Sequence, residues 1–255
     1  MIIEYHRPKT IPDALILLGW DRPVSYPLGG GTYLNRGMEG QYAVVDLQAL
    51  EIRTISKKEN LLHVGATATI QELLDFNGLA EDIYKAIKNE GTYNLRQMAT
   101  IAGTLLTANG RSPLALIMLT LDASLEILEL DKAPLKVQLG DWLPIRAGNK
   151  PGKLITKVSF PINLNISYES IARTPADQPI VCAAIAQWAS GRTRLVLGGW
   201  GQAPILAMDG PEADGIEIAA RNAYSHAEDE WASADYHQEM AAVLAQRCLK
   251  RLQQE

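Results

Sequence analysis

Two segments rich in glycine and threonine carry the residue types from which proteins build phosphate-binding loops. The first reads Leu28-Gly29-Gly30-Gly31-Thr32-Tyr33-Leu34, and the second covers Met98 to Ala108 around Thr100-Ile101-Ala102-Gly103-Thr104. Small residues let backbone N–H groups approach an anion closely, and a neighbouring threonine hydroxyl can donate one more hydrogen bond. If the two segments fold together, they can hold a diphosphate from opposite sides.

Other nucleotide-binding motifs do not fit the first segment. A G-x-G-x-x-G fingerprint that begins at Gly29 requires glycine where Leu34 stands, and no Gly-Lys-Ser/Thr follows to make a Walker A loop. Alone, the first segment is equally well explained as a tight turn and the second as a simple bend. The sequence contains no G-x-S-x-G nucleophile elbow, which argues against a hydrolase.

Metal ligands are sparse. Cys182 and Cys248 stand alone, and the four histidines are scattered, so no spacing indicates converging ligands. We therefore expect no metal ion or iron–sulfur cluster in this chain. Both thiols are best interpreted as buried and inert.

Composition and charge describe an ordinary globular protein. Of 255 residues, 47% are hydrophobic and 21% charged, and the net charge is −5, with 24 Lys+Arg against 29 Asp+Glu. No basic run indicates nucleic-acid binding. The N-terminus lacks signal-peptide features, and the apolar stretch Leu114 to Leu121 is too short to span a bilayer. These features predict a cytoplasmic protein with no membrane or nucleic-acid partner.

Short strands and helices are expected to position the two segments. Thr10 to Asp13 and Thr69 to Glu72 are helix-start patterns, and a strand at 24–27 leads directly into the triple glycine. Further strands are predicted at 44–47, 61–66, 125–130, 135–139 and 154–160, and further helices at 80–88 and 113–121. Residues 166–198 suit a three-stranded antiparallel sheet, followed by helices at 214–226 and 233–252. The predicted fold class is α+β with two lobes.

Several ordered motifs resemble one family nearly end to end. Its opening, a Tyr or Phe shortly before Arg-Pro, is similar to Tyr5-His6-Arg7-Pro8, and its two loops A-G-G-T-D-L and I-R-N-x-A-T-I-G-G-N are similar to Gly29–Leu34 and Leu95–Thr104. Leu119–Ala123, Gly198-Gly199-Trp200 with Pro204, and Ser233–His237 with Arg247 match further landmarks. The chain therefore resembles the FAD-binding medium subunit, or flavin domain, of molybdenum hydroxylases such as xanthine dehydrogenase and carbon monoxide dehydrogenase.

This resemblance implies a fold and a role. Residues 1–163 would form an FAD-binding lobe of the vanillyl-alcohol-oxidase type with sub-lobes at roughly 1–50 and 51–163. Residues 164–255 would form a carbon monoxide dehydrogenase flavoprotein-like C-terminal domain of antiparallel sheet plus helices. Such subunits pass electrons from a partner's iron–sulfur clusters through FAD to an acceptor. The implied partners are a molybdopterin-binding large subunit and an iron–sulfur small subunit, and the implied cofactor is FAD.

The resemblance also implies binding residues. The FAD diphosphate would be held from one side by Gly29, Gly30, Gly31, Thr32, Tyr33 and Leu34, and from the other by Thr100, Ala102, Gly103, Thr104 and Thr107. Ile155 would make an apolar contact to the flavin. No acid–base catalytic residue is implied.

Several positions depart from the family pattern. Ala102 replaces a glycine, Thr104 an asparagine and Tyr33 an aspartate, while Pro113 stands for an acid that meets the nucleotide and Glu169 for a basic residue near the flavin in some members. If position 102 needs a positive φ, its Cβ costs on the order of 1 kcal/mol. These departures support an alternative function, a flavin-free paralogue of the same fold that acts as a structural or assembly subunit.

Overall fold

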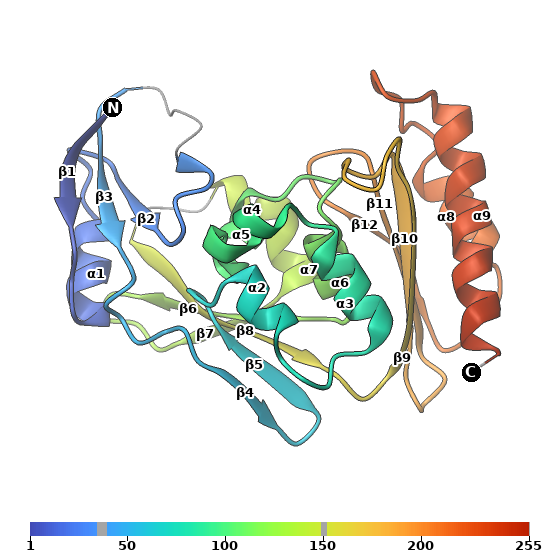
Figure 1. The fold of residues 1–255 in the computed structure, drawn as a ribbon, viewed down its shortest axis with the longest axis horizontal. Coiled ribbons are helices and arrows are strands. Elements are labelled where there is room, and N and C mark those ends of the chain that lie inside the picture. The colour runs from blue at the N-terminus through green and yellow to red at the C-terminus, as the bar shows by residue number, and fades with distance from the viewer. Residues whose placement is uncertain (35–39, 149–151, 255) are drawn as a thin grey trace. The chain divides into compact units, whose positions relative to one another are not determined.

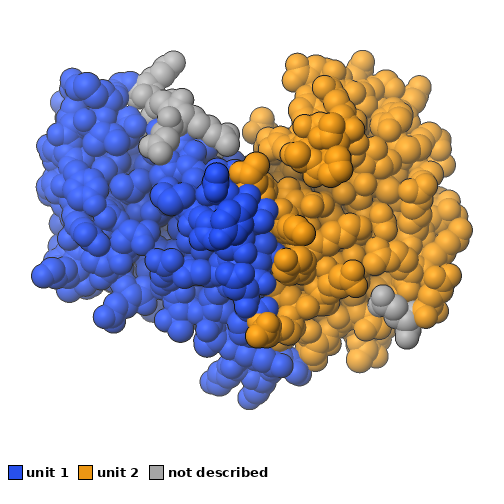
Figure 2. Space-filling view, viewed as in Figure 1, with its two compact units in different colours: residues 1–76, 93–107, 124–160 blue, residues 77–92, 108–123, 161–255 orange. Residues whose placement is uncertain are grey.

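The computed structural model describes residues 1–34, 40–148 and 152–254. Two compact units alternate along the chain (Figure 2). Unit 1 takes residues 1–76, 93–107 and 124–160, and unit 2 takes residues 77–92, 108–123 and 161–255. The units thus interleave in sequence, whereas the predicted division into 1–163 and 164–255 follows chain order and stays a prediction.

Unit 1 is built on two sheets (Figure 1). In the first, β3 lies between β1 and β2 and pairs in parallel with both. The second has the order β4-β5-β8-β6-β7, with antiparallel β4–β5, β8–β6 and β6–β7 pairs. The strands are β1 (Ile2–His6), β2 (Ser25–Leu28), β3 (Tyr42–Asp46), β4 (Ile55–Lys58), β5 (Leu61–Gly65), β6 (Ser124–Glu129), β7 (Leu135–Gln138) and β8 (Lys153–Pro161).

The end of β3 explains the motif at the start of the chain. Asp46 is buried, and its carboxylate accepts a hydrogen bond from the Tyr5 hydroxyl and lies 3.4 Å from Nε of Arg7. A buried carboxylate needs such partners to offset its lost hydration. The Tyr-x-Arg-Pro opening therefore anchors β1 to the strand beside it.

Two helices of unit 1 begin at the capping residues that the sequence predicts. Thr10 caps α1 by accepting from Asp13 N, and Thr69 caps α2 in a full capping box with Glu72. Apolar side chains of α1 then pack with Val45, Leu47 and Leu154 in one core cluster. The helical segments are α1 (Ile11–Leu18), α2 (Ile70–Leu74), α4 (Tyr93–Met98), α5 (Ile101–Thr107), α7 (Leu139–Trp142) and the 3-10 helix η2 (Leu143–Gly148).

The second glycine–threonine segment corrects an expectation. Sequence reasoning treated Met98 to Ala108 as a loop, but α5 occupies Ile101–Thr107, and α4 ends at Met98. Only Ala99 and Thr100 separate the two helices, and Ile101 N donates to the Ala68 carbonyl at 2.9 Å. Burial of Ile101 and Leu105 explains why a segment of low polarity prefers a helix here.

Unit 2 is a sheet packed between helices. Its order is β12-β11-β10-β9, all antiparallel, so the predicted three-stranded sheet is confirmed and gains a fourth strand. Helices α8 and α9 cover one face of this sheet, and α6 and α3 cover the opposite face (Figure 1). The elements are α3 (Glu81–Lys88), α6 (Pro113–Thr120), β9 (Asn165–Ile171), β10 (Val181–Gln187), β11 (Thr193–Gly198), β12 (Ile205–Gly210), α8 (Ile216–Ala223) and α9 (Ala234–Leu252).

The core of unit 2 explains the alternation in its strands. Val181, Ala183 and Ile185 of β10 pack with Leu195 and Leu197 of β11 against apolar residues of α8 and α9. Both cysteines are buried: Cys248 belongs to this cluster, and burial raises the pKa of both thiols. Among the described residues, no helix has the length and apolar character needed to cross a membrane.

Candidate functional site

A cavity of about 260 Å³ in unit 1 brings together the end of β2, the start of α5 and the start of β8. Most of its wall is apolar, and aromatic rings come from Tyr26 and Trp142. Its lining consists of Tyr26, Pro27, Gly29, Leu47, Ala66, Thr67, Thr100, Ala102, Gly103, Leu106, Ile127, Trp142, Arg146, Lys153, Leu154 and Ile155. Five of the residues predicted to bind the cofactor are therefore neighbours around one cavity: Gly29, Thr100, Ala102, Gly103 and Ile155.

The two glycine–threonine segments contact each other directly. A Cβ atom on Gly29 would lie 2.8 Å from Oγ1 of Thr100, and one on Gly30 would lie 1.5 Å from the carbonyl oxygen of Met98. Gly31 adopts φ +71°, in the left-handed region that glycine enters at little cost. The triple glycine is therefore required for the close approach of the two segments, whatever ligand they bind.

The remaining predicted residues of the first segment lie outside the lining of the cavity. Thr32 and Leu34 are half-buried, and Tyr33 is 48% exposed. All three follow Gly31 at the end of the same short turn, so they are close in sequence to the wall formed by Gly29. Their assignment as cofactor contacts stays a prediction.

Hydrogen bonds within α5 occupy the polar groups of the second segment. Thr100 is buried, and its Oγ1 accepts from Gly103 N at 3.3 Å. Thr104 N donates to the Thr100 carbonyl at 2.9 Å, and the Thr107 hydroxyl donates to the Gly103 carbonyl at 2.9 Å. Thr104 and Thr107 do not belong to the cavity lining. Of the diphosphate-binding residues predicted in the second segment, Thr100, Ala102 and Gly103 are the ones that line the cavity.

Ala102 is not strained. It lies in the first turn of α5, and its N–H points toward the Ala66 carbonyl at 3.3 Å. The non-glycine residues with positive φ in the described part of the chain are Glu51, Glu59, Asp122 and Asp131. Position 102 therefore does not need a positive φ, and the energetic cost of a Cβ in that conformation does not arise. Alanine is instead a good helix former. Its methyl group affects only the space available at the cavity, where Ala102 is part of the wall.

Sequence reasoning missed the two cations of the cavity. Arg146 of η2 donates from Nη1 to the Leu143 carbonyl at 2.7 Å, and burial lowers the pKa of its guanidinium. Lys153 opens β8, and its Nζ lies 3.9 Å from Oε2 of Glu129. No signal in the sequence separated these two side chains from other surface cations, because their shared position depends on the path of η2 and β8.

The lining fits the chemistry of FAD. Two glycines stand where a side chain would collide with Thr100, apolar and aromatic groups can cover a flat ring, and the lining includes two cationic residues. The described residues of the lining include no carboxylate that would repel a diphosphate. Ligand sites commonly combine such apolar walls with a few convergent polar groups.

Two departures predicted to affect the cofactor, Glu169 and Pro113, lie in unit 2 among charged side chains. Glu169 of β9 accepts from Nη1 of Arg251 at 2.8 Å, and Nη2 of the same guanidinium lies 2.9 Å from Asp82. Asp82 is 5% exposed, and its pKa is raised by burial against the opposing effect of Arg251. The negative charge of Glu169 is therefore neutralised by the last turn of α9.

Pro113 is compensated in a different way. It is the first residue of α6, where its missing N–H leaves no hydrogen bond unmade. The carboxylate of Glu90 sits at this helix start and accepts from Ser112 Oγ and Leu114 N, both at 2.8 Å. Burial raises the pKa of Glu90 to about 7, although both hydrogen bonds favour the charged form. Glu90 thus places an acid at the end of α6 where the family resemblance expects one.

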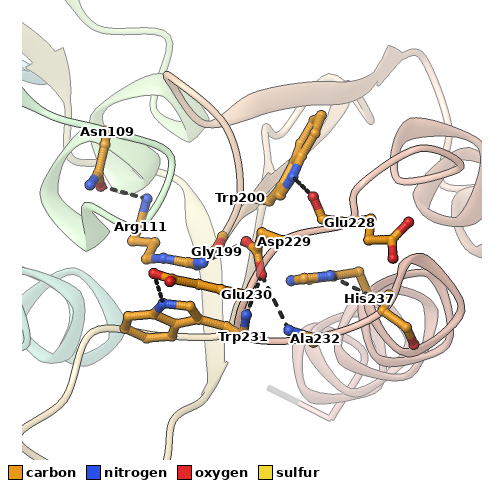
Figure 3. Close-up of polar contacts among 11 residues, drawn as sticks. Asn109, Arg111, Gly199, Trp200, Glu228, Asp229, Glu230, Trp231, Ala232 and His237 are labelled. Atoms are coloured by element: carbon orange, nitrogen blue, oxygen red, sulfur yellow. Dashed lines mark hydrogen bonds and ion pairs between the residues drawn. The ribbon is translucent and has the colours of Figure 1, made fainter.

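A cluster around Arg111 explains the glycine turn of unit 2 (Figure 3). The Arg111 guanidinium donates to the Gly199 carbonyl, pairs with Asp229 at 2.6 Å and lies 4.0 Å above the Trp231 ring. Asp229 in turn accepts from the backbone N–H groups of Trp231 and Ala232. Gly199 has φ +114°, and a Cβ there would lie 2.0 Å from the Ile180 carbonyl oxygen. The motif holds three loops of unit 2 together.

The last motif is a helix cap. Ser233 accepts from Tyr236 N at 3.3 Å at the start of α9, and Nδ1 of His237 lies 3.2 Å from the Ser233 carbonyl. Across the described ranges, no group of three His, Cys, Asp or Glu side chains is arranged to hold a metal ion.

Comparisons with known proteins agree with the geometry of unit 1. The model of the FAD binding domain in molybdopterin dehydrogenase matches residues 1–163. The nicotinate dehydrogenase FAD-subunit of Eubacterium barkeri is 30% identical over 148 residues, which are 54% of this chain and 50% of that subunit. The carbon monoxide dehydrogenase medium chain of Afipia carboxidovorans is 25% identical over an alignment of 277 residues, covering 97% of this chain and 96% of that one.

Solved structures share the fold of the whole chain. A chain of the cyanide-inactivated Cu,Mo-CO dehydrogenase superimposes with a TM-score of 0.83 at 23% identity, covering 99% of this chain and 98% of that chain. A chain of quinoline 2-oxidoreductase from Pseudomonas putida 86 gives 0.80 at 22% identity, with coverage of 98% and 96%. Because the family model matches 163 of the 255 residues, the chain belongs to the FAD binding domains in molybdopterin dehydrogenases, a family of oxidoreductase subunits.

Proposed function

We propose that this chain is the FAD-binding electron-transfer subunit of a molybdenum hydroxylase-type complex. Its partners in that complex are a molybdopterin-binding large subunit and an iron–sulfur small subunit, and its location is the cytoplasm. The family and the full-length similarity to a carbon monoxide dehydrogenase medium chain support this assignment. In this role the chain itself carries no metal ion or cluster. It consists of two domains in chain order, an FAD-binding domain at 1–163 and a C-terminal domain at 164–255.

The observation that carries the proposal is the cavity at which the two glycine–threonine segments meet. Gly29 and Gly103 both line it, and both are positions where a Cβ would lie 2.8 Å from Oγ1 of Thr100. Close packing without side chains exposes backbone N–H groups to a bound anion. In the proposed site the diphosphate lies between Gly29, Gly30, Gly31, Thr32, Tyr33 and Leu34 on one side and Thr100, Ala102 and Gly103 on the other. Thr104 and Thr107, which lie outside the cavity lining, stay predicted contacts.

The protein contributes binding and orientation, whereas the cofactor supplies the redox chemistry. When bound, FAD accepts electrons from a partner's clusters and delivers them to an acceptor. Ile155 of β8 and the neighbouring Leu154 offer an apolar surface to a ring of the cofactor. Such surfaces exclude water and fix the plane of the ring.

One observation favours the flavin-free alternative. Ala102 adds a methyl group to the wall of the cavity at a position where the family has glycine. Loss of cofactor binding would leave the fold intact, because Ala102 is compatible with helix α5. In this alternative the chain is a structural or assembly subunit.

The visible spectrum of the purified protein distinguishes the two functions. The electron-transfer subunit is expected to be yellow and to release close to one equivalent of FAD on denaturation. A protein purified without flavin is then titrated with FAD, alone and after co-expression with the proposed partner subunits. A colourless chain that takes up no FAD in either form excludes the electron-transfer role and leaves the structural subunit.

A further inference from the structure

The turn that follows β2 carries three successive backbone N–H groups without an acceptor. The N–H groups of Gly30, Gly31 and Thr32 make no hydrogen bond to another described residue of the chain. Gly31 has φ +71°, in the left-handed region. Successive N–H groups around a residue in this conformation can converge on one side of the chain and form an anion-binding nest. The turn therefore offers donors that a ligand can satisfy.

The direction of these donors depends on the peptide that joins Gly29 to Gly30. In a trans peptide the carbonyl and the N–H point in opposite directions, and the cis peptide bond found in the described residues is Arg22-Pro23. Whatever holds the Gly29 carbonyl therefore also sets the direction of the Gly30 N–H. Glycines have no Cβ to restrict rotation, so a turn of three glycines needs an external contact to stay in one orientation.

The side chain of Gln48 provides that contact. Its Nε2 donates to the Gly29 carbonyl oxygen at 2.9 Å. Only the nitrogen of a side-chain amide can donate to a carbonyl, so the contact also fixes which way the amide is turned. Gly29 and Gln48 both follow the carboxyl ends of parallel strands, since β2 pairs with β3 and Leu28 lies opposite Asp46. The parallel pairing thus brings the two residues together.

The backbone of Gln48 is itself anchored. Its N–H donates to Oδ1 of buried Asp46 at 2.9 Å, and Leu47 N donates to the Leu28 carbonyl at 3.0 Å. The other carboxylate oxygen of Asp46 accepts from the Tyr5 hydroxyl. The place of Gln48 beside the turn is therefore set by β3 and by the N-terminal motif, and its side chain has only to span the remaining gap.

We propose that Gln48 is a positioning residue of the diphosphate site: it holds the Gly29 peptide so that the three N–H groups that follow are pre-organised for the anion. The inference rests on the proposed function, because it concerns the same cofactor. Gln48 does not line the cavity, so it acts on the ligand through the turn. A turn that is already held before the ligand arrives loses less conformational freedom on binding, and the difference appears as affinity.

Exposure of this hydrogen bond sets the size of the expected effect. Gln48 is exposed, so water can replace the lost partner at the Gly29 carbonyl and the fold should be nearly unaffected by its removal. What is lost is the preference of the turn for one orientation. A preference equal to one net hydrogen bond changes affinity about three- to tenfold. The change should be confined to ligands that contain a diphosphate.

The test removes the donor while it keeps the length of the side chain. The full chain of the wild type and of Gln48→Met is titrated by calorimetry with FAD and ADP, which contain a diphosphate, and with riboflavin and adenosine, which do not. Affinity for FAD and ADP should fall about three- to tenfold in the variant. Affinity for riboflavin and adenosine should stay close to the wild-type value. The ³¹P NMR resonances of bound FAD should also shift, because the N–H groups around the phosphates are no longer fixed.

Gln41→Met is the matched control. Gln41 is an exposed glutamine directly before β3, at the opposite end of that strand from Gln48 and outside the cavity lining. The control makes the same exchange of an amide for a thioether, and should bind all four ligands like the wild type with unshifted ³¹P resonances. Melting temperatures establish that both variants are folded.

The outcomes distinguish this inference from the proposed function. Unchanged affinity for FAD and ADP in folded Gln48→Met, or equal losses for all four ligands, overturns the role of Gln48 and leaves the proposed function in place. A wild type that binds ADP, with the expected loss in Gln48→Met, but does not bind FAD supports the role of Gln48 and overturns the proposed function. A wild type that binds neither diphosphate ligand overturns both.

Discussion

Units 1 and 2 differ in how they accommodate departures from the family pattern. In unit 2, Glu169 is paired with Arg251, and the carboxylate of Glu90 lies at the start of the helix that begins at Pro113. In unit 1, Ala102 lies in a regular helix with no strain and no new partner. The replacements in unit 2 are therefore tied into the stability of the fold, whereas the one at the unit 1 cavity changes only the shape of a wall.

This difference teaches where to look for a loss of function. A compensated replacement shows that a charge had to be balanced once it was buried, and says little about a ligand. An uncompensated replacement at a cavity affects a ligand and leaves stability almost unchanged. The comparison predicts large effects on unfolding for changes in unit 2, and small effects on unfolding with a change in binding for Ala102.

The largest effect is expected from Arg251→Ala. The substitution removes the guanidinium that pairs with both Glu169 and Asp82, and leaves one carboxylate that is 5% exposed without its ionic partner. Removing one partner of a buried pair costs about 3–5 kcal/mol, and partial exposure of Arg251 reduces this to about 2–3 kcal/mol. Urea unfolding measures the loss. Arg247→Ala, on an exposed position one turn earlier in α9, is the matched control and should cost less than about 0.5 kcal/mol.

An equal small loss in both variants would contradict the comparison. In that case the ion pair between Glu169 and Arg251 would contribute little to the free energy of unfolding, and Glu169 would affect stability as little as the methyl group of Ala102.

A smaller effect, visible in its pH dependence, is expected from Glu90→Gln. The pKa of Glu90 is raised from 4.5 to about 7 in the folded state. Its contribution to stability is therefore fully present below pH 4.5 and is lost as the pH rises to 7, because the folded state then has to carry a buried charge. The shift corresponds to about 3 kcal/mol, which we reduce to about 2 kcal/mol because part of the side chain reaches the surface.

The glutamine variant keeps an oxygen acceptor for Ser112 and Leu114 and has no charge to bury. Its melting temperature should change less than that of the wild type between pH 5 and pH 8, and it should be the more stable protein at pH 8. Thermal unfolding at intervals of half a pH unit measures this, with Glu212→Gln as a control at an exposed position of unit 2. If the melting temperatures of wild type and Glu90→Gln change in parallel with pH, the charge of Glu90 at the start of α6 has no influence on stability.

Local patterns predicted much of the fold. Thr10 and Thr69 are side-chain caps of the helices that follow them, as their spacing to an acid three residues later indicates. Ser233 caps α9, which begins close to the predicted helix start at 233. The three-stranded sheet predicted in 166–198 corresponds to β9, β10 and β11. The helical nature of Ile101–Thr107 was missed, because glycine and threonine have low intrinsic helix propensity and the helix depends on the burial of Ile101 and Leu105 by distant elements.

The candidate site was predictable only where it follows from backbone requirements. Gly29 and Gly103 were found because glycine is needed where the backbones of two segments approach each other. Arg146 and Lys153 were not found, since a cation on a wall looks in sequence like any solvated cation. The compensating roles of Glu90 and Arg251 were missed for the same reason, because each depends on a contact between residues more than twenty positions apart.

The smallest effect on stability, and the sharpest test of the comparison, is expected from Ala102→Gly. Glycine restores the family residue and removes a methyl group from the cavity wall, so FAD affinity should rise severalfold. The same change lowers helix propensity in α5, which should cost about 0.5–1 kcal/mol of unfolding free energy. Ala219→Gly on α8 provides the matched control, with a similar loss of stability and no change in FAD affinity. Fluorescence titration with FAD and urea unfolding separate the two effects. If Ala102→Gly weakens binding, the methyl group is itself a favourable contact to the ligand, and the departure in unit 1 is a compensated one like those in unit 2.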